Sequence, residues 1–542
     1  MSLASTAAAI GATYGALAFF LALTLTQSYK HIAKGHYDAD KYHSARNSQG
    51  PLALALSFFA SGAGAWILFA VPEAAILGGP IALVGYALST IVPLLIFSAI
   101  SPTLRRELPH GITFFEMVDA RYGWKVNVYV TLTALFYMFL YLAAEFTSVG
   151  SAVGLLSGTG VGFQSSGLAA IVGTSIVTLV YTSFGGLPVS LVTDRVQGFG
   201  TLAFAILICI AAFGFSLFPR PLTAAEAAAD NTTTYDAALD QHNQWATATS
   251  FGISNSVGKS FSMCFILVIA VTSANMLHSG FQQRIWAASN NQAARQGLWI
   301  ASLLNVPFML LFGALGMVAY AKFGATLLSP AYIAFLSAFL LLQELHIGWQ
   351  VVAIILTVLM VASSADTIQT GFTALLTPAT EKLTAFAGLG ELKGSKKLLA
   401  LNFAITAVVN VPAIILATQN ISVLTLFVMA DLLAATCICP ILLGLSPRVH
   451  PNGALAGCVA GLLCALLCYG IGINGEAGSF VTLFQAGGLY ADTSLLAFCL
   501  TPSVSALVTL GVSGGCYPTY RFEGYSSKPS PTTAGEVHAE AE

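Results

Sequence analysis

Apolar runs of about twenty residues recur along the whole chain, and they limit what it can fold into. The chain has 542 residues, of which 56% are hydrophobic and only 8% are charged. A soluble domain carries about 25% charged residues, which cover its water-facing surface. The composition therefore excludes a soluble protein and predicts an all-α polytopic membrane protein whose main partner is the lipid bilayer.

The apolar runs predict thirteen transmembrane helices, separated by polar or Gly/Pro clusters. An odd number of crossings places the two termini on opposite sides of the membrane. The stretch 323–347 leaves room for a further amphipathic or re-entrant helix. The predicted helices cover residues 5–28, 51–75, 79–101, 125–156, 164–184, 193–218, 258–282, 297–322, 348–376, 398–417, 422–445, 454–475 and 493–516.

The distribution of basic residues predicts the orientation. With the N-terminus outside, only Arg220, Lys259 and Lys322 of the 21 Lys and Arg residues fall on the outer side. Cytoplasmic loops of membrane proteins are enriched in Lys and Arg. We therefore expect an integral multi-pass protein of the plasma membrane with an outer N-terminus and a cytoplasmic C-terminus.

Several function classes are excluded by what the chain lacks. A net charge of -2 with no basic stripe excludes nucleic acid as a partner. The nine cysteines lie within or at the ends of apolar runs, so we expect neither a disulfide framework nor a metal site. No catalytic arrangement occurs at membrane depth, since His278 stands alone as a packing or hydrogen-bonding residue. We therefore expect no enzyme.

Two segments are predicted to lie outside the membrane. The outer loop 219–257 contains Asn231 in an Asn-Thr-Thr sequon, which would be a glycosylation site in a eukaryotic host. The tail 526–542 is rich in Ser, Pro, Thr and acidic residues, which predicts disorder.

The second predicted helix contains a weak point. Two glycines and a serine occur within five positions, and unwinding there would free backbone carbonyls for a cation or a polar solute. Close helix packing through small residues explains the same pattern equally well. The residues concerned are Ser61, Gly62 and Gly64.

The ninth predicted helix ends in a polar cluster that contains Ser363, Ser364, Asp366 and Thr367. Oxygen ligands at this density suit a hard monovalent cation, and the carboxylate would supply a compensating charge. Alternatively, the serines bond back to carbonyls of their own helix and Asp366 marks its cytoplasmic end.

Glu145 and Asp431 are single carboxylates in otherwise apolar predicted helices, so each needs a partner or a proton. A proton relay is one interpretation, and a hydrogen bond that joins two helices is the other. Glu73 is expected near the outer surface, where water would solvate it.

A turn is predicted after the fifth helix. Gly185 and Gly186 allow a tight reversal, and Thr193 or Asp194 is suited to cap the next helix. The adjacent Asp194 and Arg195 would alternatively form an inner gate at the cytoplasmic mouth.

Three motifs carry a family resemblance. Tyr181-Thr-Ser-Phe-Gly-Gly with Thr193-Asp-Arg-Val-Gln resembles the Gly-Gly and Thr-Asp signature of the sodium/solute symporter family. Gln283-Arg284-Ile-Trp-Ala-Ala is similar to the family's Gln-Arg-x-x-Ala-Ala element, and Ser363-Ser-Ala-Asp-Thr to its Ser-Thr-Ala-Asp-Ser element. Their order and spacing match over roughly residues 36–450.

The resemblance implies a leucine-transporter-like core of two inverted five-helix repeats with alternating access. The repeats would be 51–218 and 258–445, with 1–50 as an extra helix and cytoplasmic loop and 446–525 as two peripheral helices. It implies a sodium site formed by the carbonyls of Ala60, Ala63 and Met360 and the hydroxyls of Ser363 and Ser364. It also implies a solute site near Ser61, Gly62, Gly64 and Trp66, with Glu145, Asp194, Arg195, Asp366 and Asp431 as candidates for gating or coupling.

The segment Ala65-Trp66 to Val71-Pro72 is similar to the sodium/proline branch, which carries an aspartate where this chain has Gly62. The leading hypothesis is a symporter that imports a small polar solute, such as an amino acid or urea, with sodium as coupling ion. A proton in place of sodium remains an alternative. An uncoupled channel or sensor is the rival from another class.

Overall fold

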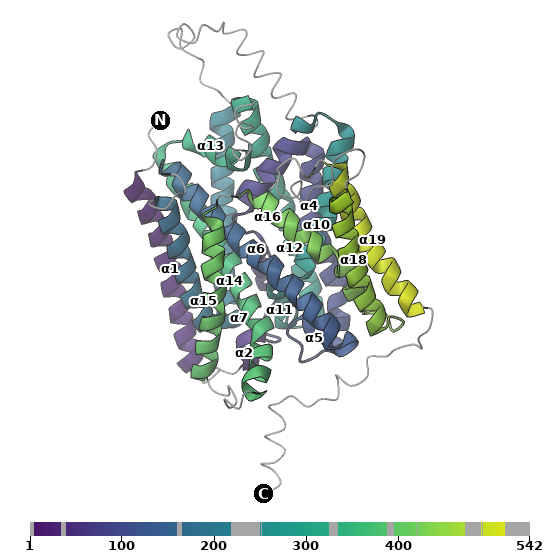
Figure 1. Ribbon diagram of the computed structural model, residues 1–542. Helices are drawn as coiled ribbons and strands as arrows, with labels where there is room; N and C mark the ends of the chain where they lie inside the picture. Colours follow the sequence, from purple (N-terminus) through teal and green to yellow (C-terminus); the bar gives the residue numbers. More distant parts are fainter. Residues whose placement is uncertain are drawn as a thin grey trace, which may run out of the picture.

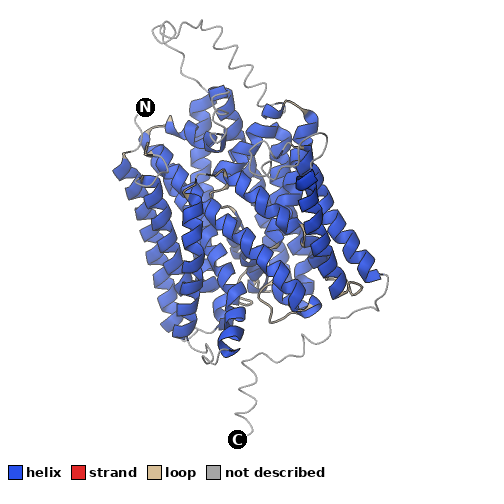
Figure 2. Ribbon diagram, viewed as in Figure 1, coloured by secondary structure: helices blue, strands red, loops and turns tan. Residues whose placement is uncertain are grey.

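Helices make up the regular structure throughout the part of the chain that the computed structural model describes (Figure 2). The only β pairing in that part is an isolated bridge between Gln49 and Ala288. The described residues are 5–33, 39–159, 165–217, 250, 252–324, 334–386, 395–419, 421–471, 489 and 491–514.

The helices follow one another with short connections. The first half of the chain contains α1 (Thr6–Ala33), α2 (Ala39–Ser44), α3 (Pro51–Gly62), α4 (Ile67–Glu107), α5 (Phe114–Tyr122), α6 (Trp124–Leu156) and α7 (Ser166–Leu217). The second half contains η1 (Gly252–Ser254), α10 (Val257–Met276), α11 (Ser279–Ala287), α12 (Asn291–Phe323), η3 (Ala334–Leu336), α13 (Ser337–Gln343), α14 (Ile347–Phe386), α15 (Ser395–Ala417), α16 (Val423–Ala435), α17 (Ile438–Leu443), α18 (Pro451–Ile471) and α19 (Asp492–Gly514).

Ten of the described helices are long and apolar enough to cross a membrane. Two shorter apolar helices, α3 and α16, accompany them. The prediction of an all-α, multi-pass membrane protein is confirmed, whereas the count of thirteen crossings stays a prediction. The stretch 323–347 contains the short helices η3 and α13.

Glycines divide two of the longest helices. Gly79 within α4 and Gly186 within α7 have positive φ angles of 64° and 57°, and the helical geometry is interrupted at both. These positions coincide with predicted helix boundaries. The predicted cap is wrong: the helix resumes directly after Gly186, and the Thr193 hydroxyl donates back to the carbonyls of Val189 and Ser190.

Two helices are broken completely. α3 ends at Gly62 and α4 begins at Ile67, as the glycine pattern predicted. α10 ends at Met276 and α11 begins at Ser279, with His278 in an extended conformation between them. The sequence predicted an unbroken helix over 258–282, so this second break was missed.

The broken helices lie inside the bundle. α3 and α4 pack against α12, and α3 also contacts α14 and α7. α1 packs on α7 and α14 at one end of the bundle, and α18 and α19 form a pair at the other (Figure 1). Both breaks are therefore surrounded by other helices. The outer loop around Asn231 and the tail 526–542 lie outside the described residues.

Replacing Gly186 with alanine is expected to destabilise the protein by about 1–3 kcal/mol, because a side chain at positive φ is strained. The new Cβ would also lie 2.7 Å from the Tyr42 carbonyl oxygen. Gly214→Ala, in the same helix with nothing within 4 Å of the new Cβ, is the matched control. Thermal unfolding of the purified protein in detergent measures both, and equal midpoints would contradict the strain at Gly186.

Candidate functional site

The Glu145 carboxylate lies inside the break between α3 and α4. Its Oε2 accepts a hydrogen bond of 2.9 Å from the Ala65 backbone N–H, and the Trp66 N–H is a second backbone neighbour. A Cβ on Gly64 would lie only 1.8 Å from Glu145 Oε1, so only glycine fits there. A negative charge at these N–H groups caps the first turn of α4, which otherwise has unsatisfied donors.

The hydroxyl cluster of α14 faces the same break. Ser364 neighbours the Glu145 carboxyl group, and its hydroxyl also donates back to the Val361 carbonyl at 3.4 Å. Ser363 instead donates across to Asp194 Oδ1 at 2.9 Å. The two segments that the sequence marked as oxygen-rich therefore meet, and α6 and α7 join them through one carboxylate each.

Asp194 forms a buried salt bridge with Arg284 of α11. Its Oδ2 lies 2.7 Å from Arg284 Nη2 and also accepts a 2.5 Å hydrogen bond from Ser57 of α3. Both charged side chains have no exposed surface. The expected pairing with the adjacent Arg195 is wrong, because Arg195 donates instead to Gln49 Oε1. A gating role for Asp194 and Arg195 stays a prediction.

The candidate sodium ligands lie between these two bridges. In α3, Ala60 and Ala63 fall between Ser57, which bonds Asp194, and Ala65, which bonds Glu145. No backbone N–H among the described residues donates to their two carbonyls outside the helix pattern, since the Ala63 N–H itself bonds Phe59. In α14, Met360, Ser363 and Ser364 are buried and belong to an uninterrupted helix. Ligation of sodium by these five residues stays a prediction.

Transition-metal chemistry has no support at the described residues, where no group of three His, Cys, Asp or Glu side chains lies together. The eight described cysteines are free. Carbonyl and hydroxyl oxygens, which hard cations prefer, are the donors that the break supplies.

Asp366 lies in the interior of α14, which continues to Phe386. The alternative that Asp366 marks the end of this helix is therefore wrong. Thr182 of α7 donates to its Oδ1 at 2.8 Å, whereas Oδ2 has no hydrogen-bond partner. Glu73 is also fully buried, contrary to expectation, and accepts a 2.8 Å hydrogen bond from Ser422.

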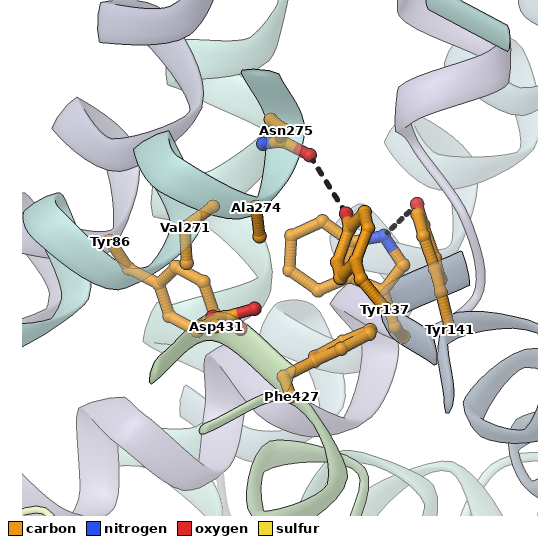
Figure 3. A pocket seen from close by; sticks show the side chains of 9 residues that line it. Tyr86, Tyr137, Tyr141, Val271, Ala274, Asn275, Phe427 and Asp431 are labelled. Atoms are coloured by element: carbon orange, nitrogen blue, oxygen red, sulfur yellow. Dashed lines mark hydrogen bonds between the residues drawn. The ribbon is translucent and has the colours of Figure 1, made fainter. Parts of the chain in front are cut away.

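A small cavity of about 20 Å³ lies beside the break, with room for about one water molecule. Helices α4, α6, α10 and α16 contribute its walls together with the break itself. Figure 3 shows the rings of Tyr86, Tyr137, Tyr141 and Phe427 gathered around it with Asp431 among them. The lining residues are Trp66, Tyr86, Tyr137, Tyr141, Val271, Ala274, Asn275, Phe427 and Asp431.

Among the predicted solute-binding residues, Trp66 lines this cavity. Its Nε1 donates to the Tyr141 hydroxyl at 2.9 Å and to the Gly62 carbonyl at 3.2 Å. Ser61 donates back to the Phe58 carbonyl. Solute contacts of Ser61, Gly62 and Gly64 stay predictions.

Sequence reasoning missed most of the cavity. Tyr137 and Tyr141 lie one turn apart on α6, as do Phe427 and Asp431 on α16, so their spacing carried a weak signal. His278 was taken as a packing residue, and its ring stacks on Phe281 with centroids 4.3 Å apart. Its position in the second helix break was not foreseen.

Broken helices around a buried polar site define the class of protein, which is a membrane transporter. The model of the Sodium:solute symporter family matches residues 42–461, and the chain belongs to this family. A curated relative, "Spermidine transporter DUR31" of Candida albicans (strain SC5314 / ATCC MYA-2876), is 24% identical over 512 residues, covering 92% of this chain and 87% of the relative.

Solved transporters have the same fold. The chain is similar to a Na⁺-coupled sialic acid symporter in a substrate-bound outward-open state, with a TM-score of 0.68, 15% identity, and coverage of 94% of this chain and 98% of that one. It is also similar to Mhp1, a nucleobase-cation-symport-1 family transporter, with a TM-score of 0.52, 13% identity, and coverage of 90% and 97%. The leucine-transporter-like fold with its inverted repeats is confirmed.

Replacing Asp194 with asparagine is expected to lower the free energy of unfolding by about 3–5 kcal/mol, because Arg284 would keep a buried charge without a counter-ion. The double variant D194N/R284Q should recover part of this loss. Arg195→Gln serves as the control, since its partner Gln49 is uncharged. Denaturant unfolding in detergent measures all four proteins, and additive effects of the two substitutions would contradict the coupling.

Proposed function

We propose that this protein is a secondary active symporter that uses a sodium gradient to import a small polar organic solute by alternating access. The observation that carries the proposal is the meeting of the α3/α4 break with Ser363 and Ser364 of α14. Membership of the Sodium:solute symporter family supports sodium as the coupling ion.

Coupling requires that the ion and the solute each bind one state of the transporter better than the other. The break serves both, since its carbonyls face α14 while Trp66 lines the neighbouring cavity. On an inside-negative membrane, each entering positive charge contributes about 2.3 kcal/mol per 100 mV. This corresponds to roughly fifty-fold accumulation of solute per sodium ion.

The proposed location is the plasma membrane, with the N-terminus outside and the C-terminus in the cytoplasm. The excess of Lys and Arg on one side of the predicted topology supports this orientation. The division into repeats at 51–218 and 258–445 is part of the proposal, and the breaks in the first helix of each support it.

The solute candidates come from three sources. Proline and urea follow from the resemblance of the Trp66 segment and of the family signature. The curated relative named as a spermidine transporter adds a polyamine. All three are small and polar, and a cavity of about 20 Å³ must widen before any of them binds.

Uptake into proteoliposomes tests the proposal. The expected result is uphill accumulation that needs an inward sodium gradient, with exchange of labelled for unlabelled solute. A fixed potassium diffusion potential separates the sodium gradient from the membrane potential. Uptake that neither saturates nor exceeds equilibrium would identify a channel and overturn the proposal.

Ser364→Ala is expected to raise the sodium concentration for half-maximal uptake about tenfold or more, because removing one charge-assisted ligand costs about 1.5–3 kcal/mol. Thr357→Ala, two turns earlier in α14, removes a buried hydroxyl that bonds only the Ala353 carbonyl. This control should leave the sodium dependence unchanged. An unchanged value for Ser364→Ala would remove Ser364 from the site.

A proton-coupled mechanism is the second candidate, because Glu145 Oε1 is buried without a hydrogen-bond partner. Under this alternative, Glu145→Gln abolishes uptake driven by a pH gradient, while the amide oxygen still accepts from Ala65. Glu73→Gln removes another buried carboxyl group and is the control. Uptake by Glu145→Gln that responds fully to the pH gradient would leave Glu145 as a structural residue.

A further inference from the structure

Asp431 is a buried carboxylate without a partner. Its residue is 3% exposed, and it forms no hydrogen bond or ion pair with any residue that the structure describes. Other polar groups at the same cavity are satisfied, since Tyr137 donates to Asn275 at 3.2 Å and Trp66 donates to Tyr141. An unpaired charge at membrane depth costs several kcal/mol, so Asp431 lacks a cation.

Aromatic rings form the rest of the cavity wall. Trp66 lies 5.6 Å from both Tyr86 and Phe427, measured between ring centroids. Tyr141 lies 5.3 Å from Phe427 and 5.9 Å from Tyr137. Five rings thus surround a space that one carboxylate enters (Figure 3).

This chemistry discriminates between cations. No Lys, Arg or His is among the nine lining residues, so a cation must come from outside the chain. Ring faces attract alkylammonium groups and supply none of the oxygen ligands that a hard ion requires. Sodium is better served by the carbonyls and hydroxyls on the other side of Trp66.

We propose that Asp431 and the surrounding rings bind a positively charged amine of the transported solute, which makes the substrate class an organic ammonium ion. The inference rests on the proposed symport function and adds the charge of the solute to it. Asp431 thereby becomes a specificity-determining residue in direct contact with the solute.

The position of the cavity fits a transported group. Its walls come from α4, α6, α10 and α16 and from the chain break, so the amine would contact elements of both proposed repeats. The volume of about 20 Å³ accommodates an ammonium head group and excludes an attached alkyl chain until the helices separate.

Ligand-induced thermal stabilisation of the purified protein in sodium buffer tests the inference. The probes are spermidine, 1,4-diaminobutane, its uncharged analogue 1,4-butanediol, proline and urea. The two amines are expected to stabilise the protein in proportion to their occupancy. Butanediol should have no effect, since it keeps the chain length and loses the charge.

Asp431→Asn is expected to raise the amine concentration for half-maximal stabilisation about thirty-fold or more. Without ligand this variant should be at least as stable as the parent, because it removes an unpaired buried charge, so a folding defect is not expected to confuse the result. Phe427→Leu keeps the apolar volume and should weaken amine binding about two- to five-fold. Glu73→Gln, which lies outside the cavity lining, is the matched control and should bind amines as the parent does.

The outcomes separate this inference from the proposed function. Amine binding that depends on Asp431, with uptake indifferent to the sodium gradient, would support the inference and contradict sodium symport. Sodium-driven uptake of proline or urea without amine binding would support symport and overturn the inference. A shift in sodium dependence in Asp431→Asn at unchanged amine affinity would make Asp431 an ion ligand and also overturn it.

Discussion

The Glu145 carboxylate inside the α3/α4 break is the interaction on which the rest of the site depends. A helix interrupted in the middle of a membrane leaves N–H and C=O groups that neither water nor lipid can satisfy. Glu145 accepts from the N–H groups that begin α4, which leaves the carbonyls at the end of α3 available for another partner. The close approach at Gly64 fixes the position of this carboxylate.

Two carboxylates hold the two sides of the break in different ways. Asp194 is neutralised by Arg284 and ties Ser57 of α3 to Ser363 of α14. Glu145 has no cationic partner among the described residues and lies next to Ser364. The region between them combines negative charge with free oxygens, and Trp66 separates it from the aromatic cavity. Ion and solute would therefore bind on two sides of one short segment, which gives a physical basis for coupling.

Local patterns made much of this predictable. Gly62 and Gly64 indicated the first break, and the hydroxyls at 363 and 364 indicated the polar face of α14, because such residues are costly in a helix that only faces lipid. Gly79 and Gly186 fall at predicted boundaries. The second break carries no comparable glycine pair before His278, so its apolar run concealed it. The partner of Asp194 was missed because Arg284 is ninety residues away in sequence and meets it only through helix packing.

Equilibrium binding of ²²Na⁺ to the purified protein tests the central claim most directly. The account predicts saturable binding that potassium displaces poorly and that the double variant S363A/S364A loses. Binding of ²²Na⁺ by the double variant with unchanged affinity and stoichiometry would contradict a sodium site between the chain break and α14.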